Sequence, residues 1–167
     1  MMKLRSSLRL PAVNMTHYDH VDVQESDFSI QNEYEMLREN NQQDGAIVFF
    51  TGLVRDFNQG SNVTGLYLEH YPAMTQKALK TIISQARSRW PISRVRLVHR
   101  VGQLNLSDQI VFVGISSPHR ESAFEACMFI MDYLKNQAPF WKKENTMTGQ
   151  TWVSAAEKDK LAMNKWQ

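Results

Sequence analysis

The sequence is short of cysteine, of long hydrophobic runs and of net charge, and each shortage excludes a class of protein. Cys127 is the single cysteine, so no internal disulfide can form, which fits a reducing, cytoplasmic compartment. No apolar stretch approaches the roughly 18 residues of a membrane-spanning helix. A net charge of +2 does not by itself indicate binding to nucleic acid. The 167 residues, 43% of them hydrophobic, suit one globular domain.

Motifs for metal and nucleotide chemistry are also missing. No Walker-type loop, GxGxxG or GxSxG motif occurs, and the five histidines never combine with cysteine or carboxylate in a metal-ligand spacing. His17-x-x-His20 comes nearest, but it lies in an N-terminal stretch that we exclude from the fold. Cys127 falls on the apolar face of a predicted helix, so we expect a packed thiol. The sequence predicts no metal site.

The first fourteen residues are basic, contain serine and lack acids. This composition resembles a weak transit peptide, although no clear processing site follows. A flexible extension, or an upstream start with Met15 as the natural one, explains it more simply. We therefore assign residues 1–27 to an N-terminal extension, flexible at least to Asn14, and residues 28–167 to a single domain.

Helical and strand periods alternate along this domain. Helices are predicted near 29–40, from Met74 to Trp90, from Ser117-Pro118 to about Gln137, and near 155–164. Strands are predicted at 45–54, 65–70, 94–101, 109–115 and around Trp152, with a polar, flexible loop at 55–62. The strands at 45–54 and 109–115 are apolar and β-prone, so we expect both to be buried. Because the order is not strictly βαβ, the predicted fold class is α+β.

The periods also predict which side chains face the core. The expected inner residues of the first helix are Ile30, Tyr34 and Leu37, those of the second Met74, Ala78, Leu79, Ile82, Ile83, Ala86 and Trp90, and those of the third Ala123, Cys127, Ile130, Met131 and Leu134. Along 94–101, Val95, Leu97, His99 and Val101 alternate with Arg94, Arg96, Val98 and Arg100.

Cations at the ends of predicted elements are the remaining candidates for a site. Arg55 follows the strand at 45–54. His119 and Arg120 occupy the first turn of the third helix, where free N–H groups favour anions. Lys135 lies in the last turn of the same helix.

A second cationic stretch follows immediately in the segment Ala138-Pro139-Phe140-Trp141-Lys142-Lys143. Pro139 excludes a continuous helix from Lys135 to Lys142, so the chain must turn between them. Two ammonium groups brought to about 4 Å would repel by roughly 4 kcal/mol and so favour a neutral amine. The residues alone predict a pocket for a phosphate or carboxylate and leave open whether a lysine in it is activated.

Five blocks of the sequence resemble the large, catalytic subunit of molybdopterin synthase. They are FTGLVRD (50–56), LEHYPAMTQKAL (68–79), RWPISRVRLVHRVGQL (89–104), VFVGISSPHRESAFEACMFIMDYLKNQAPFWKKE (111–144) and TWV (151–153). They occur in order and with compatible spacing, so that the resemblance covers residues 28–153. Together they are highly specific to that family.

The resemblance implies an α/β hammerhead fold with a mixed or antiparallel sheet and packed helices. It implies a homodimer flanked by two copies of a small ubiquitin-like sulfur-carrier subunit, which makes a heterotetramer. The implied substrate is cyclic pyranopterin monophosphate, or precursor Z. The carrier's Gly-Gly tail ends in a thiocarboxylate, and two sulfurs transferred in succession form the dithiolene of molybdopterin. The large subunit of the family holds no metal and no other cofactor.

The resemblance also assigns roles to residues. Lys135 of DYLK matches the catalytic lysine, and Lys142 of APFWK matches its partner near the thiocarboxylate. The matching substrate-binding positions are Leu53, Val54, Arg55, His119, Arg120, Lys143 and Glu144. On this interpretation Pro139 turns the chain back, so that both lysines face one pocket.

Two positions depart from the family's pattern. Where many relatives read GKVR, this chain reads Gly52-Leu53-Val54-Arg55 and so lacks one cation. Four residues beyond Trp152, bacterial relatives often carry an arginine that reaches the neighbouring subunit's site, and this chain has Ala156. Lys158 and Lys160 are the candidates to replace that arginine.

Two other functions stay open from the residues alone. A pI near 8.7, three arginines on one face of the 94–101 strand and a Phe-Trp-Lys-Lys stretch would suit a nucleic-acid-binding module. Such a module would bind with a steep dependence on salt and ignore pterins. Schiff-base chemistry at Lys135 is the other alternative, and borohydride would then trap a carbonyl substrate on that residue.

Overall fold

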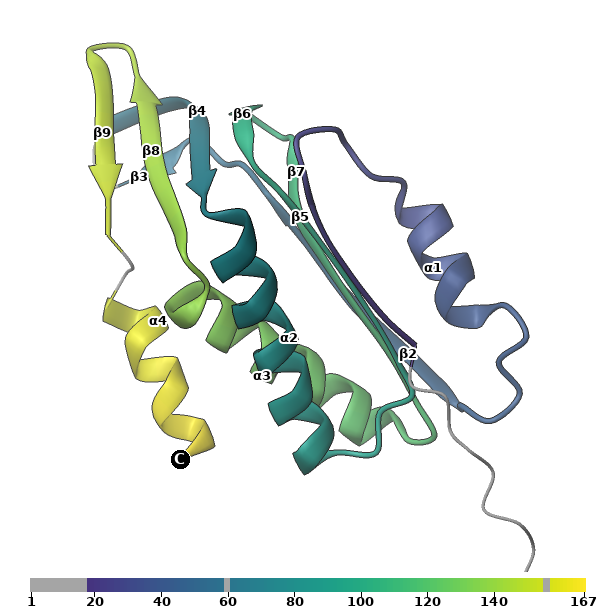
Figure 1. Cartoon of the computed structure of the whole chain (residues 1–167). Helices are drawn as coiled ribbons and strands as arrows, with labels where there is room; N and C mark the ends of the chain where they lie inside the picture. The colour runs from purple at the N-terminus through teal and green to yellow at the C-terminus, as the bar shows by residue number, and fades with distance from the viewer. Residues whose placement is uncertain (1–17, 59–60, 155–156) are drawn as a thin grey trace, which may run out of the picture.

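A four-stranded sheet forms the centre of the fold. The computed structural model describes residues 18–58, 61–154 and 157–167. Its central strands are β1 (Tyr18–Gln24), β2 (Ala46–Leu53), β5 (Arg94–Arg100) and β7 (Gln109–Ser117). They run in the order β1-β5-β7-β2, and β1 pairs with β5 in parallel while the other pairs are antiparallel (Figure 1).

A second, antiparallel sheet stands beyond one end of the first, at the upper left of Figure 1. It contains β3 (Phe57–Asn58), β4 (Ser61–His70), β6 (Gly102–Asn105), β8 (Phe140–Thr146) and β9 (Gly149–Val153). The order is β3-β4-β8-β9, and β6 also pairs with β4. Since β6 follows β5 after one residue, the two sheets are directly connected there.

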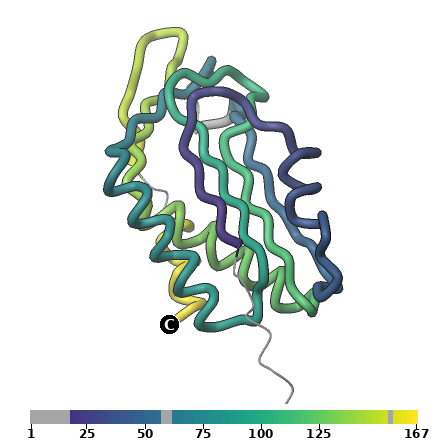
Figure 2. The backbone as a smooth tube through the Cα atoms, turned by 45° about the vertical axis from the view of Figure 1, so that its right-hand side comes forward, coloured from purple at the N-terminus to yellow at the C-terminus, as the bar shows by residue number. Residues whose placement is uncertain are grey.

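Helices cover both faces of the central sheet (Figure 2). α2 (Pro72–Arg89) and α3 (Arg120–Gln137) pack on one face, and α1 (Ile30–Arg38) packs on the other. The main core lies under α2 and α3, where their apolar faces meet the inner residues of β5 and β7. A smaller cluster of Phe28, Leu37, Val98 and Phe112 lies under α1. This arrangement confirms the predicted α+β class.

The C-terminal segment is tied to α2 and α3 through Trp166. It consists of α4 (Glu157–Ala162) and a 3-10 helix, η1 (Met163–Trp166). The Trp166 ring is buried edge-to-face against Trp90 and Phe129, and its Nε1 donates to Asp132 Oδ2 at 2.8 Å. Arg89 donates to the backbone oxygen of Trp166 at 2.7 Å. The predicted last helix is therefore present, although residues 155–156 lie outside the described ranges.

The third helix agrees with the sequence in its inner face but not in its start. Its five expected inner residues are all buried. The predicted start at Ser117-Pro118 is wrong, because Ser117 still belongs to β7 and α3 begins at Arg120 after His119. The Ser117 hydroxyl instead donates to Pro91 O at 2.8 Å and accepts from His119 N at 3.3 Å.

Two predictions about the 45–62 region are corrected. β2 is present, but it is an edge strand and is not fully buried: Phe49 and Phe50 are each 43% exposed and Leu53 is 54% exposed. An apolar run does not tell a central strand from an edge strand, and among the described residues β2 pairs with β7 on one side only. The expected loop at 55–62 contains β3 and the first residues of β4.

Three smaller expectations also change. Met74 is 59% exposed, so the inner face of α2 begins at Thr75 rather than at Met74. The strand β8, which starts at Phe140 directly after Pro139, was not expected. Residues 18–24, assigned to the N-terminal extension, form β1. The boundary between extension and domain stays a prediction, since residues 1–17 are not described.

In the described part of the chain, no helix is long and apolar enough to cross a membrane.

The close approach of α1 to β7 gives a test of this packing. A Cβ added at Gly114 would lie 2.6 Å from Leu37 Cδ1 and 2.6 Å from Phe112 Cε1. We expect Gly114→Ala to lower the free energy of unfolding by roughly 1–3 kcal/mol, measured by urea denaturation. Combined with Leu37→Ala, which removes one of the two obstacles, its cost should be smaller than in the wild type. Full additivity of the two changes would contradict the packing described here.

Candidate functional site

The two candidate lysines, Lys135 and Lys142, lie on either side of the turn from α3 into β8. Lys142 shares one face of β8 with Phe140 and Glu144, because side chains alternate along a strand. Its ammonium lies 3.1 Å from Glu144 Oε1, and Glu144 is only 7% exposed. The residue opposite Lys142 is Leu68 of β4. Lys142 therefore stands over the inner face of the second sheet with a buried carboxylate beside it.

Lys135 is held by a different carboxylate. Its ammonium lies 3.5 Å from Asp159 Oδ1 of α4, and the neighbouring Asn136 donates to the backbone oxygen of Asp159 at 2.6 Å. These contacts hold the Lys135 side chain beside the last turn of α3. The structure thus pairs each lysine with a carboxylate, and it does not show two ammonium groups in contact. Asp159 was missed from the sequence because nothing there places α4 against α3.

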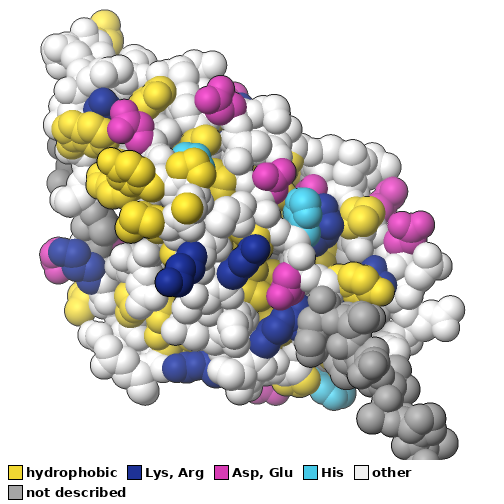
Figure 3. All heavy atoms as spheres, viewed as in Figure 1, with side chains coloured by type: hydrophobic (Ala, Val, Ile, Leu, Met, Phe, Trp, Pro, Cys, Tyr) yellow, Lys and Arg dark blue, Asp and Glu magenta, His cyan; other side chains and the backbone are white. Residues whose placement is uncertain are grey.

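Lys143 lies on the opposite face of β8 from Lys142. Its ammonium is 4.1 Å from the centre of the Trp152 ring and 3.4 Å from Glu69 Oε1. Trp141 shares this outer face and packs edge-to-face on Tyr71, with ring centres 5.1 Å apart. Figure 3 shows the hydrophobic side chains that gather here, over β8, β9 and the start of α2. The second sheet thus lies between Lys143 and the Lys142–Glu144 ion pair.

The segment from Leu53 to Arg55 reaches the same end of the molecule as Lys142. Val54 is 6% exposed and belongs to a second core cluster that includes Leu68 and packs on Phe140. Its backbone is fixed as well, since its N–H donates to Asp108 O at 2.9 Å and its carbonyl accepts from Ser107 N at 2.8 Å. Val54 therefore supports the exposed Arg55 near the β4–β8 pair. Leu53 is exposed beside it.

His119 and Arg120 lie far from the two lysines within one chain. Fifteen residues of α3 separate Arg120 from Lys135, a rise of about 22 Å. The β2–β7 ladder gives the same result, because Ala46 pairs with Ser117 and Leu53 pairs with Gln109. Arg55 and His119 follow opposite ends of this ladder, about 24 Å apart. The structure thus divides the predicted cations into two groups.

Two histidines next to Phe140, the buried His99 and the half-buried His70, were not recognised as candidates. The His99 and Phe140 rings are stacked with centres 3.9 Å apart, and the His70 ring lies 6.2 Å from Phe140. Burial lowers the pKa of His99 to about 4, which outweighs the opposing hydrogen bond to Arg100 O. His99 is therefore neutral near pH 7. Cys127 is also buried, and burial raises the pKa of its thiol to about 12, as expected for a packed thiol.

The three arginines on the outer face of β5 are occupied within the fold. Arg94 donates to Met36 O and Glu39 O at the end of α1. Arg96 pairs with Glu33 of the same helix. Arg100 is 9% exposed and donates to backbone oxygens of Glu25 and Gln109. This face attaches α1 to the sheet, so it does not form the basic surface that a nucleic-acid-binding module would need.

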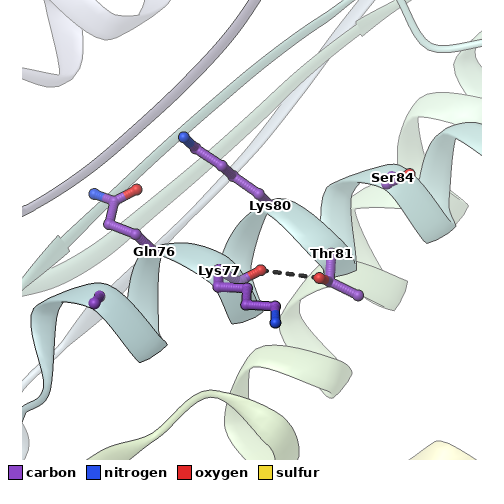
Figure 4. Close-up of a pocket in the computed structure, with 6 residues that line it drawn as sticks. Gln76, Lys77, Lys80, Thr81 and Ser84 are labelled. Carbon is purple, nitrogen blue, oxygen red and sulfur yellow. Dashed lines mark hydrogen bonds between the residues drawn. The ribbon is translucent and has the colours of Figure 1, made fainter.

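Two further features fall outside the candidate site. An open hollow of about 490 Å³ lies along α2, lined by Ala73, Gln76, Lys77, Lys80, Thr81 and Ser84 (Figure 4). Figure 4 shows that these side chains come from one helix and point in different directions. Among the described residues, no group of three or more histidine, cysteine or acidic side chains could hold a metal ion.

Comparison with known proteins identifies the family. The sequence matches the family model described as MoaE protein over residues 23–137. The chain belongs to the MoaE family. The molybdopterin synthase catalytic subunit of Vibrio cholerae is 53% identical over 150 residues, which cover 89% of this chain and 99% of that relative. The protein of the same name from Escherichia coli is 55% identical over 139 residues, or 83% of this chain and 92% of that relative.

Solved MoaE structures share the fold. The molybdopterin biosynthesis MoaE protein of Burkholderia ambifaria has a TM-score of 0.76 at 46% identity, over 89% of this chain and 97% of that one. The molybdopterin synthase structure from Staphylococcus aureus has a TM-score of 0.73 at 32% identity, over 79% of this chain and 95% of that one. The predicted resemblance to the family is confirmed.

The buried His99 predicts a pH dependence of stability for this MoaE family member. Because the pKa of His99 is about 4 in the folded protein and 6.5 in the reference state, the unfolded chain takes up the proton first as the pH falls. Protonation of His99 should not affect the free energy of unfolding above pH 6.5. It should lower that free energy by up to about 3 kcal/mol between pH 6.5 and pH 4. Urea denaturation at pH 7 and pH 4.5 measures this loss.

The matched variant is His99→Phe, which keeps a flat ring and cannot titrate. It should lose about 2–3 kcal/mol less than the wild type over the same pH interval, because the carboxylates titrate in both proteins. Equal losses in the two proteins would show that His99 is not the source.

Proposed function

We propose that this MoaE family member is the catalytic subunit of a molybdopterin synthase and acts as a sulfurtransferase. It moves sulfur from the C-terminal thiocarboxylate of a small ubiquitin-like carrier to cyclic pyranopterin monophosphate. The observation that carries this proposal is the Lys135–Lys142 turn between α3 and β8, in a chain more than half identical to enzymes of that name. The carrier partner is supported by the sequence resemblance.

The two lysines fit an anionic tail. Each already holds a carboxylate, Asp159 on Lys135 and Glu144 on Lys142, which shows that each ammonium can be reached by such a group. A thiocarboxylate has the same charge and a similar shape, so it can take the place of one of these partners. In the transfer, the thiocarboxylate sulfur bonds to a substrate carbon, and water then cleaves the carrier's acyl C–S bond, which leaves the sulfur on the substrate and a carboxylate on the carrier. We assign Lys135 and Lys142 to stabilisation of the negative charge in these steps. We assign the exposed Arg55, which follows Val54, to substrate binding.

The remaining site residues take supporting roles in this proposal. Val54 fixes the backbone before Arg55, and Glu144 orients Lys142. Lys143, on the outer face, stabilises the β8–β9 pair through Trp152. In this proposal, therefore, the predicted site residues do not all line one pocket. No bound metal or other cofactor enters the proposed transfer.

His119 and Arg120 require a second copy of the chain if they bind the same substrate molecule. A pterin monophosphate is shorter than the 22 Å or so that separates Arg120 from Lys135 along α3. Asp159 holds the Lys135 ammonium at its own end of the helix. We therefore propose a homodimer in which the N-terminal turn of α3 from one copy contributes to the site that contains Lys135 of the other copy. That turn favours a phosphate, because free N–H groups and two basic side chains meet there.

Reconstitution tests the function. The purified chain, a thiocarboxylated carrier and cyclic pyranopterin monophosphate should together form a dithiolene. Lys135→Ala and Lys142→Ala should each lower the rate at least about tenfold. Thermal unfolding should change little in Lys135→Ala, whose side chain is 48% exposed, whereas Lys142→Ala also removes an ion pair of the buried Glu144 and should lower the stability. Lys80→Ala, which removes an exposed cation from α2, is the matched control and should keep the wild-type rate. Absence of dithiolene with the wild-type chain would reject the function, and borohydride trapping on Lys135 would favour Schiff-base chemistry.

Mixed dimers test the two-chain site. Lys135→Ala and Arg120→Ala are made in differently tagged chains, and the heterodimer is purified. If each site takes Lys135 from one copy and Arg120 from the other, one of its two sites is intact, so about half the wild-type rate is expected. Both variant homodimers should be strongly impaired. A heterodimer as inactive as its parents would place all these residues in one chain's site.

A further inference from the structure

The ring of Phe140 joins the two sheets at the point where the candidate site is built. Phe140 is the first residue of β8, one position after Pro139 and two before Lys142. Its backbone N–H donates to Ala138 O at 2.9 Å, which closes the turn from α3. Its ring reaches across to β5 and lies on His99 at 3.9 Å, with the two planes 14° apart.

His99 is itself rigidly held. It is 5% exposed, and its Nδ1 lies 2.8 Å from Arg100 O. A carbonyl oxygen can only accept, so Nδ1 carries the hydrogen and the ring orientation is fixed. The next residue is fixed too, because the Arg100 side chain donates to Glu25 O at 3.1 Å and to Gln109 O at 3.2 Å. The imidazole ring therefore presents one of its own flat faces to Phe140.

We propose that His99 is a positioning residue for sulfur transfer, which holds the Phe140 ring and thereby sets Lys142 relative to the end of α3. This inference rests on the proposed function, and it concerns a residue that makes no ion pair or hydrogen bond with either lysine in the described structure. Phe140 and Lys142 lie on the same face of β8, so a tilt of the Phe140 ring moves the strand start that carries Lys142. A displacement of about 1 Å at a reacting group can cost two orders of magnitude in rate.

The role predicts an effect on kcat and little effect on carrier binding. His99 is buried between the sheets and does not form part of the surface that a folded carrier would contact. His99→Ala should lower kcat at least about tenfold and leave the Kd for the carrier within about twofold of the wild type. His99→Phe, which retains a stacking ring, should recover most of the rate. Should His99→Ala fail to fold, His99→Leu, which fills the space without a flat ring, carries the same expectation as alanine.

A double-mutant cycle shows whether His99 acts through Phe140. Phe140→Ala should lower kcat as His99→Ala does, and the double variant should be no slower than Phe140→Ala alone. The control is Val98→Ala, a truncation at the neighbouring residue of β5, whose side chain is 2% exposed and packs under α1. It should lower the stability but leave kcat of the folded enzyme unchanged. The proposal would be overturned if the kcat losses of the two single variants multiply in the double variant. It would also be overturned if Val98→Ala lowers kcat as much as His99→Ala does.

A measurement without substrate separates this inference from the proposed function. The ring-flip rate of Phe140, observed by NMR of the labelled free protein, should be slow in the wild type and in His99→Phe and at least about tenfold faster in His99→Ala. An unchanged rate would reject the positioning role even if the wild type makes dithiolene. A wild type without sulfur-transfer activity would reject the proposed function while leaving the ring measurement to decide the contact.

Discussion

Pro139 prevents α3 from continuing, and the chain after it enters β8 at once. The proline ring would clash with the preceding turn of a helix and has no N–H to donate, so the helix ends at Gln137. Because Phe140 immediately pairs with His70 of β4, no flexible linker separates the helix from the second sheet. Lys135 and Lys142 therefore stand on two regular elements joined by a single fixed turn. A site built in this way can keep its geometry without a metal or a disulfide at this turn.

Most elements could be predicted from the sequence because their periods are strong and local. The inner face of α3 is an example, since its burial follows the helical spacing. Along β5 the expected inner residues are buried, but Val98 and Arg100 of the other face are buried as well. The exposure of Phe50 could not be predicted, because an apolar strand looks the same whether one or two neighbours flank it. The start of α3 was misplaced because Ser117-Pro118 has the composition of a helix cap, whereas Ser117 pairs with Ala46 as the last residue of β7.

The candidate site was predictable as a set of residue types but not as an arrangement. Lys135, Arg55 and Arg120 stand out because they end or begin elements. Their separation depends on the direction in which α3 packs across the sheet, and no local pattern records that direction. Asp159 was invisible for the same reason, since its contact with Lys135 depends on how Trp166 fixes the C-terminal segment. His99 looked like an ordinary inner residue of a strand, and its importance follows only from the ring placed on it.

The parallel pairing of β1 with β5 bears on how the chain is made. All of α1, β2, β3, β4 and α2 lies between these two strands in the sequence. During synthesis β1 leaves the ribosome first and stays without its partner until β5 has emerged. Long-range pairs of this kind form slowly, and strands that wait for them are open to contacts with other chains. Because β5 and β2 both also pair with β7, the central sheet cannot be complete on a nascent chain until Ser117 has emerged.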